Sequence, residues 1–125
     1  MNPYQEIFET IIELSKEAGY ATFDYLPDEN QAYPFVYVGY QQNIDKITST
    51  RLLGKTHIQI DVYAEHDRRF EVSQILNDLL NVIAHHRRTR NFKYAVVNSE
   101  SQLMGDNTTD IPLVHGILEL EIQYS

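Results

Sequence analysis

Histidine and acidic side chains are the groups with which this sequence could do acid–base or metal chemistry. His85 and His86 are neighbours on an expected helix, so their side chains project about 100° apart and cannot share a metal ion in standard geometry. Residues of this kind at a helix end commonly interact with the last carbonyl groups and the helix dipole. We therefore expect no metal site at these histidines.

A catalytic triad is the second chemistry to consider. His57 and Asp61 lie four residues apart on an expected strand and could be combined with a serine. No G-x-S-x-G, P-loop, G-x-G-x-x-G or H-E-x-x-H motif accompanies them. The lack of cysteine excludes thiol catalysis, thiolate metal sites and disulfides. The sequence therefore predicts a protein that is not an enzyme and has no cofactor. The acidic residues of the first expected helix are assigned to its solvent-facing side; they are Glu6, Glu9, Glu13 and Glu17.

Basic residues form one dense cluster in an acidic chain. Ten lysines and arginines against eighteen aspartates and glutamates give a formal net charge of −8. This sign is wrong for a protein that wraps nucleic acid by neutralising phosphates. The cluster could form an anion-binding basic patch, or it could simply stabilise the end of the preceding helix; its members are Arg87, Arg88, Arg90 and Lys93.

Two stretches have the periodicity of amphipathic helices. Asn2 and Pro3 are typical of an N-cap and a first helical residue, and apolar residues then recur at three- and four-residue intervals as far as Ala18. A wide apolar stripe predicts a second helix over 68–88, with Asp67 as its N-cap. Each helix is expected to bury one face.

Strand patterns occupy most of the remaining chain. The last one, 114–124, is the clearest, because apolar residues alternate along its whole length. Links of hairpin length join most strands, which favours antiparallel pairing. We predict an α+β fold in the order α-β-β-β-α-β-β, with two helices packed on one face of a mainly antiparallel sheet of about five strands. The expected strands are 20–26, 33–40, 57–63, 92–98 with a less clear continuation to 104, and 114–124.

The length fits one domain over residues 1–125. No stretch approaches the roughly 20 apolar residues that cross a bilayer. The first residues have neither a basic leader nor an apolar run, so we expect no signal peptide and assembly in the cytoplasm.

The polar segment 41–55 fits neither a helix nor a strand period over its full length. Loops this long are usually functional or disordered. Its scattered aliphatic and basic residues predict a hairpin arm that is mobile in the free chain and orders against an adjacent copy, whose acidic N-terminal surface would complement it. The candidate contact residues are Ile44, Lys46, Ile47, Arg51, Leu52, Leu53 and Lys55.

Four segments form a recognisable set. They are Tyr33-Pro-Phe-Val-Tyr-Val-Gly39, the polar hairpin with Lys46 and Gly54, the strand Ile58–Tyr63 leading through His66-Asp-Arg-Arg69 into the long helix, and Pro112–Ile122. Together they resemble the small tail-terminator (tail-completion) proteins of long-tailed siphophages of Gram-positive hosts. The resemblance spans most of the chain.

This resemblance implies a structural protein of the virion tail. Its subunits would form a homohexameric ring on the tail tube protein, end tube polymerisation and offer the head–tail joining surface to a head–tail connector protein. The hairpin arm would contact an adjacent copy or the tail tube. An acidic lumen would let DNA pass without sticking. The family has no catalytic signature to carry over. Two other classes stay open: a small-ligand or peptide-binding domain without catalysis, and a small hydrolase.

Overall fold

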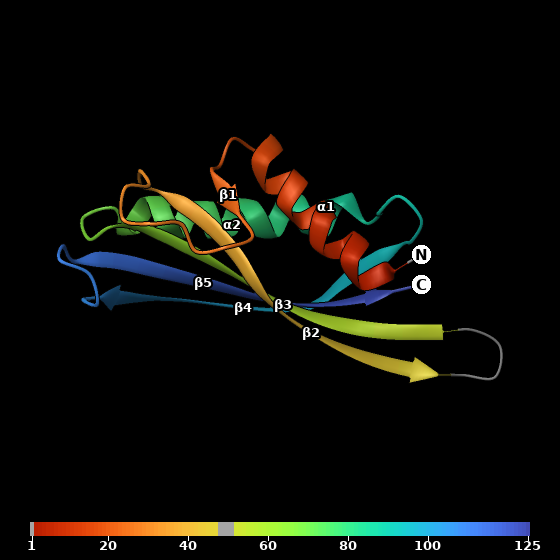
Figure 1. Ribbon diagram of the computed structural model, residues 1–125. Helices are drawn as coiled ribbons and strands as arrows, with labels where there is room; N and C mark the ends of the chain where they lie inside the picture. Colours follow the sequence, from red (N-terminus) through yellow and green to blue (C-terminus); the bar gives the residue numbers. More distant parts are fainter. Residues whose placement is uncertain (1, 48–51) are drawn as a thin grey trace.

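Two helices cover one face of a five-stranded sheet in the computed structural model (Figure 1). The structure describes residues 2–47 and 52–125, without the side chains of 46, 47, 52 and 53. The predicted α+β class and element order are confirmed. The elements are α1 (Pro3–Glu17), β1 (Thr22–Phe23), β2 (Phe35–Ile47), β3 (Leu52–Glu65), α2 (Arg69–His86), β4 (Tyr94–Asp106) and β5 (Leu113–Tyr124).

The strands lie in the order β1-β2-β3-β5-β4, and every neighbouring pair except β1 and β2 is antiparallel. The strand expected over 20–26 is only two residues long and is parallel to β2. Phe23 pairs with Tyr37 through its backbone, and its ring also packs edge to face against Tyr25 and Phe35, with centroids 5.6 and 6.2 Å away.

Local signals position the helix ends. The Asn2 side chain accepts hydrogen bonds from the Tyr4 and Gln5 amides at 3.1 and 3.2 Å, as expected of an N-cap. Asp67 does not cap α2, contrary to prediction. The Arg68 amide donates to the Glu65 carbonyl, so this turn makes Arg68 the N-cap, without a side-chain cap bond.

The core lies between the sheet and the helices. Alternate residues of β3 and β5, from Ile58 to Ala64 and from Val114 to Tyr124, face the apolar sides of α1 and α2. Gly116 of β5 lies directly under α2. A Cβ at this position would be 2.5 Å from Val72 Cγ1 and 3.0 Å from Leu76 Cδ1, so the close approach of helix and sheet requires a glycine here.

A β-bulge divides β2 into two halves. Val38 pairs with Ile60 and Tyr40 pairs with Gln59, so Gly39 is an extra residue on β2. Before the bulge, alternate residues of β2 such as Val38 enter the core. After it, β2 continues as one side of a hairpin with β3.

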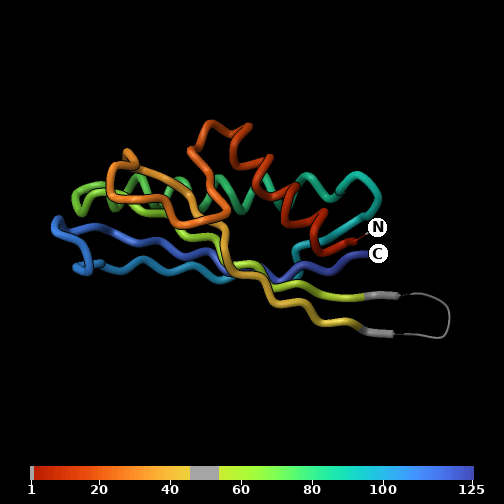
Figure 2. The backbone as a smooth tube through the Cα atoms, in the orientation of Figure 1, coloured from red at the N-terminus to blue at the C-terminus, as the bar shows by residue number. Residues whose placement is uncertain are grey.

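This hairpin extends past the rest of the sheet (Figure 2). β3 pairs with β5 only from Gly54 onward, whereas Leu53 and Leu52 pair with β2 alone, at Lys46 and Ile47. The described parts of 41–55 are therefore strand rather than loop, and they form the predicted hairpin. We call residues 41–55 the arm.

Candidate functional site

The base of the arm is tied to the start of α1 by polar side chains. Gln41 Nε2 donates to the Tyr4 carbonyl oxygen at 3.1 Å and to Thr56 Oγ1 at 2.9 Å. The fully buried Thr56 hydroxyl donates to Asn43 Oδ1 at 2.7 Å. The Tyr4 hydroxyl donates to the Asp45 carboxylate. These hydrogen bonds fix the base of the arm to the domain and set the direction in which it projects.

Gly54 makes room for this connection. The Tyr4 and Tyr124 rings meet edge to face above it, with centroids 5.3 Å apart. A Cβ on Gly54 would be 2.5 Å from Tyr4 Oη and 2.9 Å from the Ile44 carbonyl oxygen. Burial raises the pKa of Tyr4, and its hydrogen bonds to Asp45 and Tyr124 raise it further, so the phenol remains a donor at neutral pH.

Two of the predicted contact residues of the arm, Ile44 and Lys55, are described with their side chains. Ile44 and Lys55 are cross-strand partners on the sheet face away from the helices; the Ile44 side chain is exposed, and Lys55 Nζ lies 3.8 Å from Glu121 Oε1. The backbones of 46, 47, 52 and 53 extend the hairpin. The side chains of Lys46, Ile47, Leu52 and Leu53, and the whole of Arg51, lie outside the described residues.

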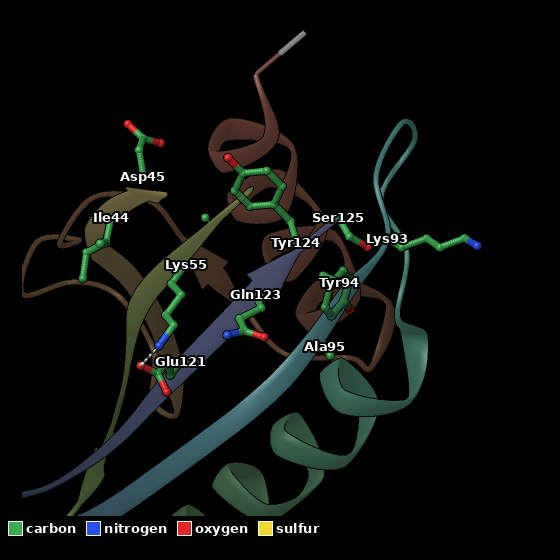
Figure 3. Close-up of a pocket in the computed structure, with 11 residues that line it drawn as sticks. Ile44, Asp45, Lys55, Lys93, Tyr94, Ala95, Glu121, Gln123, Tyr124 and Ser125 are labelled. Atoms are coloured by element: carbon green, nitrogen blue, oxygen red, sulfur yellow. Dashed lines mark ion pairs between the residues drawn. The ribbon is translucent and has the colours of Figure 1, made fainter. Parts of the chain in front are cut away.

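A concave surface of about 660 Å³ lies at the base of the arm. Ile44, Lys55, Glu121 and Tyr124 contribute to its lining (Figure 3). Figure 3 shows Lys55 reaching across to Glu121, whereas Lys93 at its edge points away. The concave surface at the base of the arm is thus lined by both apolar and charged side chains.

The basic cluster is exposed at the same end of the molecule as the arm (Figure 1). Arg87 follows α2 with a left-handed φ of 61°, and Arg88 bridges to Lys93 through the backbone. Arg90 and Lys93 project into solvent. Among the described residues, none of the four forms an ion pair. Their exposure leaves them available to an anion or to an acidic partner.

Glu6 of α1 holds the loop that carries this cluster. Its carboxylate accepts hydrogen bonds from the Asn91 side chain at 2.8 Å, the Asn91 amide at 2.9 Å and the Thr89 hydroxyl at 3.0 Å. The side-chain hydrogen bond of Asn91 is the largest cause of the lowered pKa of Glu6. Glu6 therefore has a structural role that the sequence, which placed it on a solvated face, did not predict.

A row of aromatic rings crosses the sheet on the face opposite the helices. Phe35 of β2 stacks on Tyr63 of β3, and Tyr63 stacks on His115 of β5, with centroids 5.2 and 4.2 Å apart. His115 Nε2 lies 3.2 Å from Asp61 Oδ1. Burial, followed by the charges of Asp61 and Asp106, raises the pKa of Tyr63 to about 12. Sequence reasoning missed this row, because only the register of β3 with β5 brings Tyr63 and His115 together.

The histidines named in the sequence analysis lie beside different partners. His57 and Asp61 do not pair: His57 Nε2 lies 3.4 Å from a Glu121 oxygen, and Asp61 faces His115. His85 Nδ1 lies 2.7 Å from the Asn81 carbonyl oxygen, the interaction expected near a helix end. Within residues 2–47 and 52–125, no three histidine or acidic side chains gather where they could hold a metal ion.

A second concave surface, of about 620 Å³, lies at the end of the sheet opposite the arm. We call it the distal cleft. It is bounded by the loop before β2 and the turn between β4 and β5, and the aromatic rings of Tyr33, Phe35 and Tyr63 line it. Asp106 also lines it, and hydrogen bonds from Thr108 lower the pKa of this carboxyl group.

Neither described helix is long and apolar enough to cross a membrane.

Comparison with known proteins places this fold among solved structures. No protein-family model and no curated protein matches the sequence. One solved structure that matches is a chain from the virion of a native gene transfer agent particle, with a TM-score of 0.63 and 10% identity over 93% of this chain and 91% of that chain. Another solved chain matches with a TM-score of 0.54 and 13% identity over 99% of this chain and 97% of that chain. Over nearly its whole length, the chain therefore shares its fold with a chain of a virion.

Proposed function

We propose that this chain is a structural protein of a phage-like virion, and that within the virion it is the tail terminator. The observation that carries the proposal is the fold shared with a chain of the gene transfer agent virion over 93% of this chain. The sequence resemblance to tail terminators points the same way and rests on different information. The protein would act through its shape and contacts, without catalysis or a cofactor.

In this proposal the subunits form a homohexameric ring on the end of the tail tube. The arm contacts the adjacent copy or the tube protein, and the opposite surface of the ring receives the head–tail connector. Ring assembly would bury apolar side chains that a free subunit exposes, such as Ile44 and Tyr40 on the outer face of β2. The net charge of −8 per subunit would repel DNA phosphates and keep the passing genome from adhering.

The test is a measurement of tail length with a matched arm variant. The variant replaces residues 46–53 by Asn-Gly between Asp45 and Gly54, which are register partners and so can be joined by a two-residue turn. Light scattering across a concentration range and electron microscopy of purified tails would report ring formation and tube length.

We expect the wild-type chain to cap tubes of uniform length and the arm variant to leave tubes that overgrow. The variant keeps the hydrogen bonds at the arm base, so its circular dichroism spectrum and thermal midpoint should stay close to those of the wild type. Uniform tubes in the complete absence of the chain would refute the proposed function.

A small-ligand or peptide-binding domain is the second candidate, because the two concave surfaces measure about 660 and 620 Å³, the size of many ligand sites. This second function predicts that the chain is a monomer or dimer at all concentrations and that its absence does not change tail length. The same light-scattering measurement separates it from a ring protein.

A further inference from the structure

The distal cleft is bounded by the loop before β2 and the turn between β4 and β5, and these segments lie at the opposite end of the molecule from the described part of the arm (Figures 1 and 2). An arm therefore cannot reach the cleft of its own chain. We propose that the distal cleft is the docking site for the arm of a second copy. This inference rests on the proposed ring, for which it supplies the contact between neighbours.

Aromatic rings form the floor of the cleft. Tyr33 stacks on Phe35 with centroids 5.6 Å apart and an interplanar angle of 26°, and Phe35 stacks on Tyr63 at 5.2 Å and 27°. The side chains of Leu26 and Ile111 at the rim are 59% and 50% exposed. These groups gain from contact with aliphatic side chains and with the stems of long basic side chains.

The rim of the cleft is acidic. Four carboxylates line it, and none of the lining residues in the described chain is basic. The hydrogen bonds that lower the pKa of Asp106 favour its charged form. A basic side chain placed between these carboxylates and the aromatic floor would meet opposite charge at its head group and apolar surface along its stem. The carboxylates belong to Asp28, Glu29, Asp106 and Asp110.

The arm has the complementary chemistry. Its sequence combines basic residues with four aliphatic ones between 44 and 53, within a chain whose net charge is −8. Lys55 is already near Glu121 of its own chain, so Lys46 and Arg51 are the arm residues that we assign to the partner's cleft. The other basic segment, 87–93, is held against α1 by Glu6 and fits an extended partner less well.

An arm at one end and a cleft at the other make a head-to-tail contact. Such a contact repeats from copy to copy and closes into a ring when the rotation between neighbours allows it. The distal cleft thereby gives the ring its repeating interface, using two surfaces that are far apart on one subunit.

A charge-swap experiment on the full chain tests this interface. The cleft variant carries Glu29→Lys and Asp110→Lys, two exposed acids that form no hydrogen bond within the described structure. The arm variant carries Lys46→Glu and Arg51→Glu. The matched control carries Glu13→Lys and Glu17→Lys on the exposed side of α1, which gives the same change of charge outside the cleft.

Sedimentation velocity over a concentration range gives the readout. Each swapped variant alone should associate about tenfold or more weakly than the wild type, because two attractive contacts become repulsive. An equimolar mixture of the cleft and arm variants should recover association, since each arm then meets a cleft of opposite charge. The control should associate like the wild type.

Failure of this inference differs from failure of the proposed function. Rings formed by the cleft variant alone, or a mixture that does not recover, would overturn the docking site and leave the ring intact. A control as weak as the cleft variant would overturn it too, because the effect would then follow net charge or the acidic surface of α1 rather than the cleft. A wild-type chain that neither self-associates nor caps tubes would overturn the ring itself.

Discussion

Replacement of Gly54 by alanine should loosen the base of the arm. The new Cβ would meet Tyr4 Oη at 2.5 Å and the Ile44 carbonyl oxygen at 2.9 Å, both inside normal contact distance. The tyrosine can rotate away only by giving up its hydrogen bond to Asp45, which is worth about 1 kcal/mol. The carbonyl belongs to the backbone of β2 and can yield only if the strand shifts, at a cost of about 1–3 kcal/mol.

The free energy of unfolding should therefore fall by about 2–4 kcal/mol in Gly54→Ala. Urea denaturation followed by circular dichroism measures it. Gly105→Ala is the matched control, because a Cβ at Gly105 meets nothing within 4 Å. Its unfolding free energy should stay within about 1 kcal/mol of the wild type.

A double-mutant cycle with Tyr4→Phe identifies the atom responsible. Removal of Oη alone should cost about 1 kcal/mol, and Gly54→Ala should then cost about 1 kcal/mol less in the phenylalanine background. The reasoning fails if Gly54→Ala is as stable as the control. It also fails if the cost is equal in both backgrounds, because the hydroxyl would then not be the obstacle.

Three further predictions concern the domain. Gly116→Ala should lower the free energy of unfolding by about 1–3 kcal/mol in urea denaturation, because α2 leaves no space for a methyl group; an unchanged midpoint would contradict this. Tyr94→Phe should cost about 1 kcal/mol in the same assay, since the buried hydroxyl donates to the Ile83 carbonyl at 2.8 Å; a more stable variant would show that this bond contributes nothing. The pKa of Glu6 is lowered in the folded chain, so its stabilisation is present above the unfolded pKa and is lost as pH falls through the folded value. The difference in urea midpoint between wild type and Glu6→Gln should therefore be largest near pH 7 and shrink below about pH 4.5, and a difference that does not change with pH would refute it.

Local signals predicted the helices and the last strand closely. The first helix was expected over 3–18 and is Pro3–Glu17, because Asn2 caps its start and the apolar repeat ends at Ala18. The second was expected over 68–88 and is Arg69–His86. In β5, strict alternation of apolar residues predicted the face that enters the core.

The arm was harder to predict, because polar residues occupy its inner face. Gln41, Asn43 and Thr56 pack toward α1 through hydrogen bonds to one another and to the Tyr4 carbonyl. A search for alternating apolar residues cannot detect a strand that is held in this way. Periodicity describes burial of hydrocarbon, whereas the groups that face α1 here are the buried hydroxyl of Thr56, the half-buried amide of Gln41 and the exposed amide of Asn43.

The candidate surfaces depend on contacts between distant parts of the sequence. The aromatic row needs the register of Tyr63 with His115, and the distal cleft needs the 26–35 segment beside the 106–113 turn. Neither juxtaposition follows from local composition. The sequence could identify the basic and aliphatic content of the arm, but not the acidic surface that complements it.

The bulge at Gly39 changes which residues of β2 face the helices, from even-numbered to odd-numbered ones. In the first half of the strand, even-numbered residues such as Val36 and Val38 face the helices, whereas beyond the bulge the odd-numbered Gln41 and Asn43 do so. Loss of Gly39 itself would leave Val38, Tyr40 and Gln41 in regular alternation, with both faces of β2 unchanged. Loss of one residue beyond the bulge would instead reverse the two faces of the remaining strand, turning Asn43 away from α1 and Ile44 toward it. Length changes of β2 beyond Gly39 should therefore survive in evolution only in steps of two, or where β3 compensates for them.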